Sequence, residues 1–385
     1  MSNSSKNLSR SNTISKREPE DLTIFLGGDV MTGRGIGQIF PHPSDPVLYE
    51  RFVKDSRYYL EITEKRSGPI PKPAPFDYIW GEALSEFEHF SPDVRIINLE
   101  TAVTTSDDHW PRKGIHYRMH PKNFQVLTAA GIDVCSIANN HILDWGYKGL
   151  DESLEVLREN HLSICGAGNN SADASAPAVI QAGNQRILVF AYTCADAGTP
   201  YAWRAKIEKP GVNLLTGTGR RGVKQVIQDT EKFKKVGDII ILSIHWGDNW
   251  GYEIPQSHRK LAHRLIDNES ADLIFGHSSH HPKAMEIYKD RLILYGCGDL
   301  LNDYEAIPGH EEYRPNLSCM YFPVIKPSGA LKTLQISPMK IHRFRLHRAN
   351  ENERNWLSKR LGRECRKLGT GIELTENGRM RLTWN

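Results

Sequence analysis

Five short motifs in this chain carry side chains that can bind a metal or transfer a proton, and each follows an apolar run that predicts a β-strand. They are Gly28-Asp29-Val30-Met31, Asn98-Leu99-Glu100, Asn139-Asn140-His141, His245-Trp246-Gly247 and Gly276-His277-Ser278-Ser279-His280. In α/β proteins, ligands bind where the carboxyl ends of strands meet. Because the motifs share this position, the sequence predicts one metal-centred hydrolytic site.

The histidine-rich motif is the strongest single signal. It places His277, His280 and His281 within five positions, directly after a predicted strand and a glycine. Neutral imidazole is a common metal ligand, so binding should weaken at acidic pH. His245 follows the most hydrophobic predicted strand and is another candidate ligand, with a hydrogen-bonded core histidine as the alternative.

Two carboxylates follow the first two predicted strands. Asp29 comes after two glycines, which allow the backbone to turn sharply and approach a ligand. A carboxylate there can bridge two cations, or it can cap a helix instead. Asn98 and Glu100 share one strand face by the period of two, so both can offer oxygen ligands. The alternative for Glu100 is an ion pair with an arginine at the sheet edge.

The Asn139-Asn140-His141 motif combines an amide with a group that carries a proton. The side-chain carbonyl of Asn140 can bind a hard cation. His141 is the candidate proton donor, and Asp144, three residues later, is placed to orient its ring. A capping cluster for the next helix is the alternative interpretation.

Four further residues are candidates for contacting substrate. Guanidinium groups pair with phosphate or carboxylate in a bidentate way, which makes Arg34 and Arg118 candidate anchors, with plain surface charge as the alternative. Trp246 follows His245 where the strand breaks, and Asp299 follows another predicted strand after Gly296-Cys297-Gly298. The expected substrate is anionic.

Composition indicates a folded protein with a sizeable core. The chain has 385 residues, of which 39% are hydrophobic and 25% charged, and its formal charge of +3 gives no support to nucleic-acid or membrane attraction. The six cysteines are far apart and form no CxxC, so we expect free thiols. No apolar signal region or membrane span is visible, which predicts a cytoplasmic protein with a disordered tail at 1–21.

Alternating strand and helix patterns predict a layered α/β fold. Strands are expected at 22–26, 94–99, 132–137, 162–165, 178–181, 187–192, 238–244, 272–275, 284–288, 292–295, 319–325 and 331–338, and helices at 78–90, 123–130, 150–160, 222–235 and 257–266. A proline-bearing insertion at about 41–76 should carry a helix at 48–60, as a lid or as decoration. Hairpins are expected around Gly183 and Asp290, and the strands at 319–325 and 331–338 should extend the sheet of the second half. A basic helix with Leu357 and Leu361 on one face, followed by a hairpin, should close the chain within 346–385.

Taken together, the motifs resemble those of the CapA family, the bacterial capsule or poly-γ-glutamate synthesis proteins, which look like a branch of the calcineurin-like metallophosphoesterases. The resemblance implies a four-layer α-β-β-α sandwich over 22–345, with a dinuclear metal centre between two sheets. Carried across residue by residue, it implies metal ligands at Asp29 (bridging), Glu100, Asn140, His245, His277 and near His280, and a proton donor at His141.

One residue departs from the wider superfamily. Met31 stands where typical phosphoesterases have the histidine of Asp-x-His, and a thioether is a poor ligand for a hard cation. The sequence therefore leaves two functions open. The first is a hydrolase using one or two divalent ions (Mn, Fe, Zn or Mg) on a phosphoester or a γ-glutamyl polymer. The second is a non-catalytic accessory factor that binds an anionic polymer or a polymer synthase.

Overall fold

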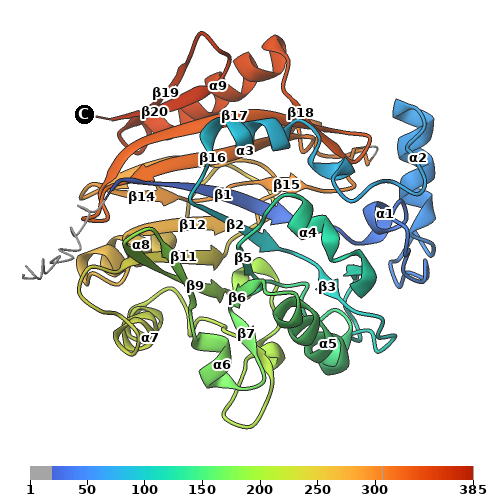
Figure 1. The fold of residues 1–385 in the computed structure, drawn as a ribbon, viewed down its shortest axis with the longest axis horizontal. Helices are drawn as coiled ribbons and strands as arrows, with labels where there is room; N and C mark the ends of the chain where they lie inside the picture. Colours follow the sequence, from blue (N-terminus) through green and yellow to red (C-terminus); the bar gives the residue numbers. More distant parts are fainter. Residues whose placement is uncertain (1–19, 306, 385) are drawn as a thin grey trace, which may run out of the picture.

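The computed structural model describes residues 20–305 and 307–384, so most of the predicted disordered tail lies outside the described residues. Two β-sheets dominate the fold (Figure 1). The larger sheet has the order β19 (Thr370–Leu374), β20 (Met380–Trp384), β17 (Leu331–His342), β16 (Leu317–Ile325), β1 (Leu22–Val30), β2 (Val94–Leu99), β5 (Val134–Ser136), β6 (Ser163–Cys165), with β15 (Asp299–Leu301) paired to β1 and β18 (Arg345–Arg348) to β17.

The smaller sheet has six strands in the order β13 (Met285–Tyr288), β14 (Arg291–Leu294), β12 (Leu273–His277), β11 (Ile239–His245), β9 (Gln185–Thr193), β8 (Ala178–Ala182). Two short ribbons complete the β structure, β3 (Ala102–Val103) with β4 (Arg118–Met119) and β7 (Ala167–Gly168) with β10 (Gly211–Val212). The hairpins predicted around Gly183 and Asp290 are confirmed as β8–β9 and β13–β14.

Alternation of side chains along the strands builds three apolar layers. In β1, Ile24 and Leu26 join a core that also contains Ile241 and Phe275 of the smaller sheet, so the two sheets pack face to face. Phe25 points the other way, into a second core on the outer face of the larger sheet. Side chains at successive positions of a strand face opposite sides, so β1 serves both cores.

Helices cover the outer face of each sheet. The larger sheet is covered by α3 (Ala83–Phe90), α4 (Gln125–Ala129) and α5 (Gly146–Glu159), and the smaller by α7 (Arg220–Glu231) and α8 (Gln256–Asp267). The remaining helices are α1 (Arg34–Gly37), α2 (Arg57–Ser67), α6 (Ser171–Ser175) and α9 (Glu351–Arg366). The predicted α/β class is confirmed, whereas assignment to the metallophosphatase type stays a prediction.

The C-terminal strands were expected to extend the second sheet, and this expectation is wrong. β16 returns to the first sheet and pairs antiparallel with β1, with Leu26 opposite Tyr321. It does so because β2 occupies only one side of β1, which leaves the other edge open for pairing. The predicted closing hairpin joins the same sheet through β20, and α9 buries the predicted Leu357 and Leu361 stripe in the core between the sheets.

The insertion contains one longer helix, but not where the apolar spacing placed it. The expected helix at 48–60 is wrong, since α2 begins at Arg57, and an isolated bridge joins Val47 to Asp55 before it. The Asp55 carboxylate accepts the backbone N–H of Arg57 at 2.9 Å, which marks a turn ahead of the helix. α2 lies at the right edge of the molecule, beside α1 (Figure 1).

Two further sequence expectations concern cysteines and membranes. All six cysteines are buried and free, as predicted. Across residues 20–305 and 307–384, no helix combines the length and the apolar character needed to cross a membrane.

Candidate metal centre

The strands that carry the motifs end at one edge of the two facing sheets. β11 and β12 are parallel, and their register sets His245 directly beside His277. β1 and β15 are also parallel, and their register sets Asp29 beside Asp299. A Cβ at Gly28 would lie 1.8 Å from the carbonyl oxygen of Gly298, so glycine allows the close approach of these two backbones.

Two groups of candidate ligands share one carboxylate. Asp29, His245 and His277 form the first group, and Asp29, Glu100 and Asp299 form the second, with the offered ligand atoms of each group within 4.8 Å of one another. All five side chains are buried. The sequence therefore located residues that the fold does bring together, with Asp29 between the two groups as expected for a bridging carboxylate.

The carboxylates of the second group repel one another in a buried space. Burial, followed by the charge of Asp299, raises the pKa of Asp29 to about 7. Burial, followed by the charge of Asp29, raises the pKa of Glu100 well above its usual range. Two donors hold Asp29 in place, the Nδ2 of Asn98 at 2.6 Å and the backbone N–H of Ser278 at 2.9 Å. A divalent cation would relieve this repulsion, so the donor set fits a metal.

Hydrogen bonding fixes the tautomer of one histidine. The Nε2 of His277 lies 2.6 Å from the Oγ of Ser243, and Ser243 donates its own hydrogen to Ser136 at 2.9 Å. Ser243 therefore accepts the Nε2–H of His277, which leaves the Nδ1 lone pair facing Asp29 Oδ1 at 3.5 Å. Burial lowers the pKa of His277 to about 3, which favours the neutral form that binds metal.

Two buried polar atoms at the centre have no protein partner. Within residues 20–305 and 307–384, neither the Nε2 of His245 nor the Oδ1 of Asn140 makes a hydrogen bond. The His245 Nε2 also lies 3.7 Å from Glu100 Oε1. Unsatisfied buried acceptors are costly unless a ligand or water completes them, so both atoms fit the predicted role of metal ligand.

The neighbouring residue, Asn139, makes structural hydrogen bonds. Asn139 donates through Nδ2 to Asn98 Oδ1 at 3.1 Å, and its Oδ1 accepts the backbone N–H of His141 at 3.0 Å. It thereby ties the end of β5 to the end of β2 and fixes the start of the loop that carries His141. The structure therefore gives Asn139 a scaffolding contact, and metal binding by Asn140 stays a prediction.

His280 and Asp299 form a hydrogen-bonded pair. The Nδ1 of His280 lies 3.0 Å from Oδ1 and 3.1 Å from Oδ2 of Asp299, and Asn302 donates to Oδ2 at 2.8 Å. Burial disfavours the charged form of His280, but the Asp299 carboxylate outweighs it and raises the pKa of the imidazole. Asp299, predicted to contact substrate, thus lies in the carboxylate group, and His280 orients it from outside both ligand groups.

Asp144 and Lys113 both contact the Nδ1 atom of His141, the predicted proton donor. His141 Nδ1 lies 2.7 Å from Asp144 Oδ2, as the spacing predicted, and its Nε2 lies 3.8 Å from Glu100 Oε1. Lys113 Nζ is 3.0 Å from the same Nδ1 and 2.5 Å from Asp144 Oδ1. Burial, followed by the Lys113 charge, lowers the pKa of His141 to about 4. Lys113 was not predicted, because it stands in a polar loop without motif or spacing.

Arg34 was predicted to anchor substrate, but the structure gives its guanidinium protein partners. Its Nε donates to Asp303 at 2.8 Å, and another nitrogen donates to Glu50 at 3.0 Å. The guanidinium also lies over the ring of Tyr59 at 3.7 Å. These contacts join the end of β1 to the insertion, which is a bracing role, and substrate binding by Arg34 stays a prediction.

Arg118 and Trp246 are likewise engaged within the protein. Arg118 donates to Asp107 Oδ1 at 2.9 Å and lies over the ring of Trp145 at 3.9 Å. Trp246 is buried, its indole N–H donates to the carbonyl of Tyr295 at 3.0 Å, and its ring stacks on His258. Their predicted contact with substrate is not tested by this geometry and stays a prediction.

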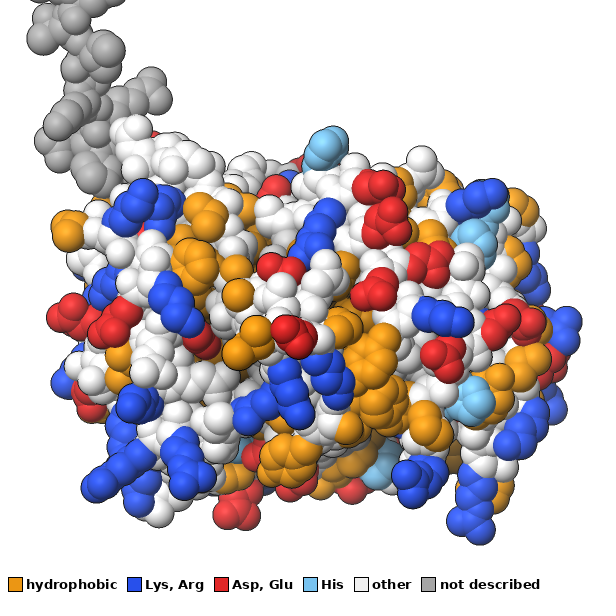
Figure 2. Space-filling view, turned by 90° about the horizontal axis from the view of Figure 1, so that it is seen from below, with side chains coloured by type: hydrophobic (Ala, Val, Ile, Leu, Met, Phe, Trp, Pro, Cys, Tyr) orange, Lys and Arg blue, Asp and Glu red, His pale blue; other side chains and the backbone are white. Residues whose placement is uncertain are grey.

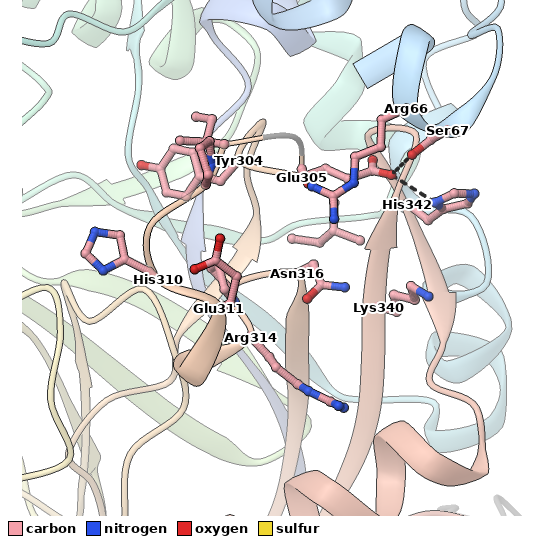
Figure 3. Close-up of a pocket in the computed structure, with 14 residues that line it drawn as sticks. Arg66, Ser67, Tyr304, Glu305, His310, Glu311, Arg314, Asn316, Lys340 and His342 are labelled. Carbon is pink, nitrogen blue, oxygen red and sulfur yellow. Dashed lines mark hydrogen bonds and ion pairs between the residues drawn. The ribbon is translucent and has the colours of Figure 1, made fainter. Parts of the chain in front are cut away.

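A cavity of about 360 Å³ lies between the end of α2, residues 304–305 and 307–316, and the end of β17 (Figure 3). Figure 3 shows Ser67 and His342 pointing at the carboxylate of Glu305, to which they hydrogen-bond at 2.5 and 2.9 Å. Tyr304 lines this cavity, packs edge-on against His280, and shares a 2.8 Å hydrogen bond with Tyr117. The insertion therefore borders a cavity next to the candidate metal centre.

The fold and the site together define a class, an α/β sandwich with a buried centre of carboxylates and imidazoles at its strand ends. The chain belongs to the bacterial capsule synthesis protein family (PGA_cap), whose model matches residues 23–304, a range that contains every predicted motif. The family resemblance read from the motifs is confirmed.

Several curated relatives are similar over most of this chain. A "Probable polyglutamine synthesis accessory protein" of Mycobacterium tuberculosis is 42% identical over 361 residues, covering 92% of this chain and 94% of the relative. The "PGA biosynthesis protein CapA" of Bacillus subtilis is 27% identical, covering 78% of this chain and 73% of the relative. The "Capsule biosynthesis protein CapA" of Bacillus anthracis is 25% identical, covering 75% of this chain and 62% of the relative.

Proposed function

We propose that this protein is a metal-dependent hydrolase that acts on an anionic substrate in capsule or poly-γ-glutamate metabolism. The observation that carries the proposal is that Asp29 belongs to two groups of candidate ligands. One group contains two histidines, and the other contains carboxylates alone. The names of the relatives concern capsule biosynthesis, PGA biosynthesis and polyglutamine synthesis, which supports a role in polymer metabolism. The scissile group is a phosphoester or a γ-glutamyl amide.

The two groups suit one or two divalent ions, such as Mn, Fe, Zn or Mg. Asp29, His245 and His277 would hold one ion, and Asn140 offers a further oxygen. Glu100 and Asp299 would hold a second, with Asp29 in common. A bound divalent ion supplies Lewis acidity and lowers the pKa of water toward neutrality.

Met31 fits a site that differs from the common phosphoesterase pattern. Its side chain is buried in the core on the outer face of the larger sheet. Asp299 provides an oxygen beside Asp29 from β15 instead. This difference supports a second ion held by oxygen ligands alone, the type of site preferred by hard cations.

His141 is proposed to donate a proton to the departing oxygen or nitrogen. Its Nε2 faces the Glu100 side of the centre, while its Nδ1 faces both Asp144 and Lys113. When Lys113 donates to Nδ1, the ring proton resides on Nε2. Its transfer to a leaving group is balanced by movement of the Lys113 proton to Nδ1, so that the ring stays neutral. Asp144 neutralises Lys113 and prevents an unpaired buried charge.

A second candidate function is supported by a relative's name. The Mycobacterium tuberculosis relative is called an accessory protein of polymer synthesis. Under this alternative, the metal centre binds an anionic polymer or supports contact with a polymer synthase, without turnover. The family link to synthesis is compatible with either function.

The test combines metal content with hydrolysis. Purified protein is analysed for bound metal, then assayed with Mn²⁺ on a generic phosphodiester and on poly-γ-glutamate. We expect His277→Ala to lose metal and His141→Ala to keep metal but lose turnover. His161→Ala, at an exposed position before β6, is the control for histidine removal. Metal binding without turnover in the wild type would support the accessory function, and identical behaviour of the two site variants would refute the roles assigned.

A further inference from the structure

A second cavity lies outside the metal centre and shares none of its candidate ligands. It has a volume of about 600 Å³, within the range of about 300–1,000 Å³ that is typical of ligand sites. Its walls come from α6, α7 and the segment around β10, and the lining includes Arg204, Asn213, Arg221, Lys224, Gln225 and Gln228. In Figure 1, α6 and α7 lie at the bottom of the molecule. Figure 2 views that side, where Lys and Arg side chains gather in the lower left part.

The lining carries an excess of positive charge. Arg204, Arg221, Lys224 and Lys232 face a single carboxylate, Asp229, so four cations less one anion leave a net charge of +3. Asp229 pairs with Lys232 at 3.1 Å. The charged groups of Arg221 and Lys224 have no hydrogen bond or ion pair anywhere in residues 20–305 and 307–384. Two cations in a cavity without protein partners suit an anionic ligand.

Side-chain amides stand among these cations. Gln225 donates to Asn213 Oδ1 at 3.1 Å and accepts the backbone N–H of Thr216 at 3.0 Å, which fixes one wall. Gln228 lies one turn further along α7 and also lines the cavity. An amide side chain both donates and accepts hydrogen bonds, so it can pair with a peptide group of a ligand.

We propose that this cavity binds a segment of an acidic peptide chain, a ligand that carries a carboxylate and an amide in every residue. Guanidinium and ammonium groups pair with the carboxylates, and the side-chain amide of Gln228 pairs with a backbone amide of the ligand, whereas Gln225 is held by the protein. A phosphate chain would satisfy only the cations. The choice of a glutamyl chain rests on the proposed function, because the cavity gives such a polymer a second contact on the protein.

The experiment measures binding of a fluorescent pentamer of γ-linked glutamate to the full-length protein, with an α-linked pentamer and tripolyphosphate as competitors. Arg221→Ala/Lys224→Ala removes two exposed cations of the cavity. Arg220→Ala/Lys235→Ala is the matched control, because it removes the same charge from exposed positions outside the lining. At an ionic strength of about 0.15 M, cations that do not contact the ligand are partly screened, so the contacting cations should contribute most.

We expect the cavity variant to bind either pentamer at least about tenfold more weakly, and the control variant to bind within about twofold of the wild type. Chelator-treated wild type and His277→Ala should bind the pentamer normally even when hydrolysis is lost. Failure of the proposed hydrolase function can therefore be told apart from failure of the proposed binding in the cavity. Three results would overturn the proposal. They are absence of pentamer binding, equal losses in the two double variants, and tighter binding of tripolyphosphate than of both pentamers.

Discussion

The Nδ1 atoms of His245 and His277 lie 2.8 Å apart, at matching positions of two adjacent parallel strands. The Nε2–H of His277 is committed to Ser243, so its Nδ1 carries a lone pair. His245 therefore donates its own Nδ1–H to this lone pair when no cation is present. The Nε2 of His245 keeps its lone pair for a cation, and the protons released on metal binding would come from the buried carboxyl groups.

This linkage predicts that metal affinity rises with pH between about 5 and 8. The pKa of Asp29 is raised to about 7 and that of Glu100 well above its usual range, so both carboxyls hold protons that a cation must displace. Titration calorimetry with Mn²⁺ at several pH values measures the effect. Affinity that is constant or falls across this interval would contradict the proposed ligand set.

The same shifts predict how the metal-free protein responds to pH. Asp29 binds its proton more tightly when folded than when unfolded, so ionising it costs more in the folded state. The free energy of unfolding should therefore fall as pH rises from about 4, the unfolded pKa, to about 7, the folded pKa. Denaturant unfolding of the chelated wild type, compared with Asp29→Asn, isolates this contribution. The variant should show a weaker decline across the interval, and an equal decline would exclude Asp29 as its source.

A third prediction concerns the serine behind the metal centre. Ser243→Ala removes the acceptor of the His277 Nε2–H at 2.6 Å while leaving the candidate ligands in place. Loss of such an orienting partner typically weakens metal binding by about 10–100-fold. Titration with Mn²⁺ measures the change, and Ser153→Ala, another fully buried serine that bonds only backbone groups of β3 and α5, is the control. Equal affinities for the two variants would show that Ser243 does not orient the ligand.

The sequence predicted several of the side chains that the fold brings together, because strand ends are local signals. An apolar run that stops before Asp29 or His245 places the side chain at a strand tip, and parallel strands bring such tips together. Contacts from irregular loops leave no such signal. Lys113 reaches His141 from the loop between β3 and β4, where neither spacing nor polarity distinguishes it from surface lysines.

The sequence also could not assign the last strands to a sheet. The β16 and β17 patterns predict strands of either sheet, because alternation reports burial and not the partner. Their partner is β1, far away in the chain, and the choice depends on which sheet edge is open. The sequence likewise could not identify the partners of Arg34 and Arg118, for which substrate roles were expected. A lone arginine gives no sign of whether a ligand or a buried carboxylate will pair with it.

A fourth prediction tests Lys113 as a residue that positions the proton of His141. Lys113→Met removes the donor at Nδ1, so Asp144 takes the Nδ1–H and the Nε2 loses its proton. We expect kcat to fall by about 10–100-fold with metal content unchanged, and Lys113→Arg to restore part of it. Nitrogen NMR of the His141 ring should show the proton moving from Nε2 to Nδ1. An unchanged tautomer would refute the positioning role, and exposed Lys122→Met is the control.

The last prediction separates bracing from substrate binding at Arg34. Arg34→Ala leaves Asp303 and Glu50 as buried carboxylates without their cation, a change that typically costs about 3–5 kcal/mol. Arg57→Ala breaks an exposed pair with Asp55 and should leave the free energy of unfolding nearly unchanged. Denaturant unfolding of both variants measures the difference. If Arg34 instead anchors substrate, Arg34→Ala will be as stable as Arg57→Ala and will raise KM, because a guanidinium that binds ligand contributes mainly when the ligand is present.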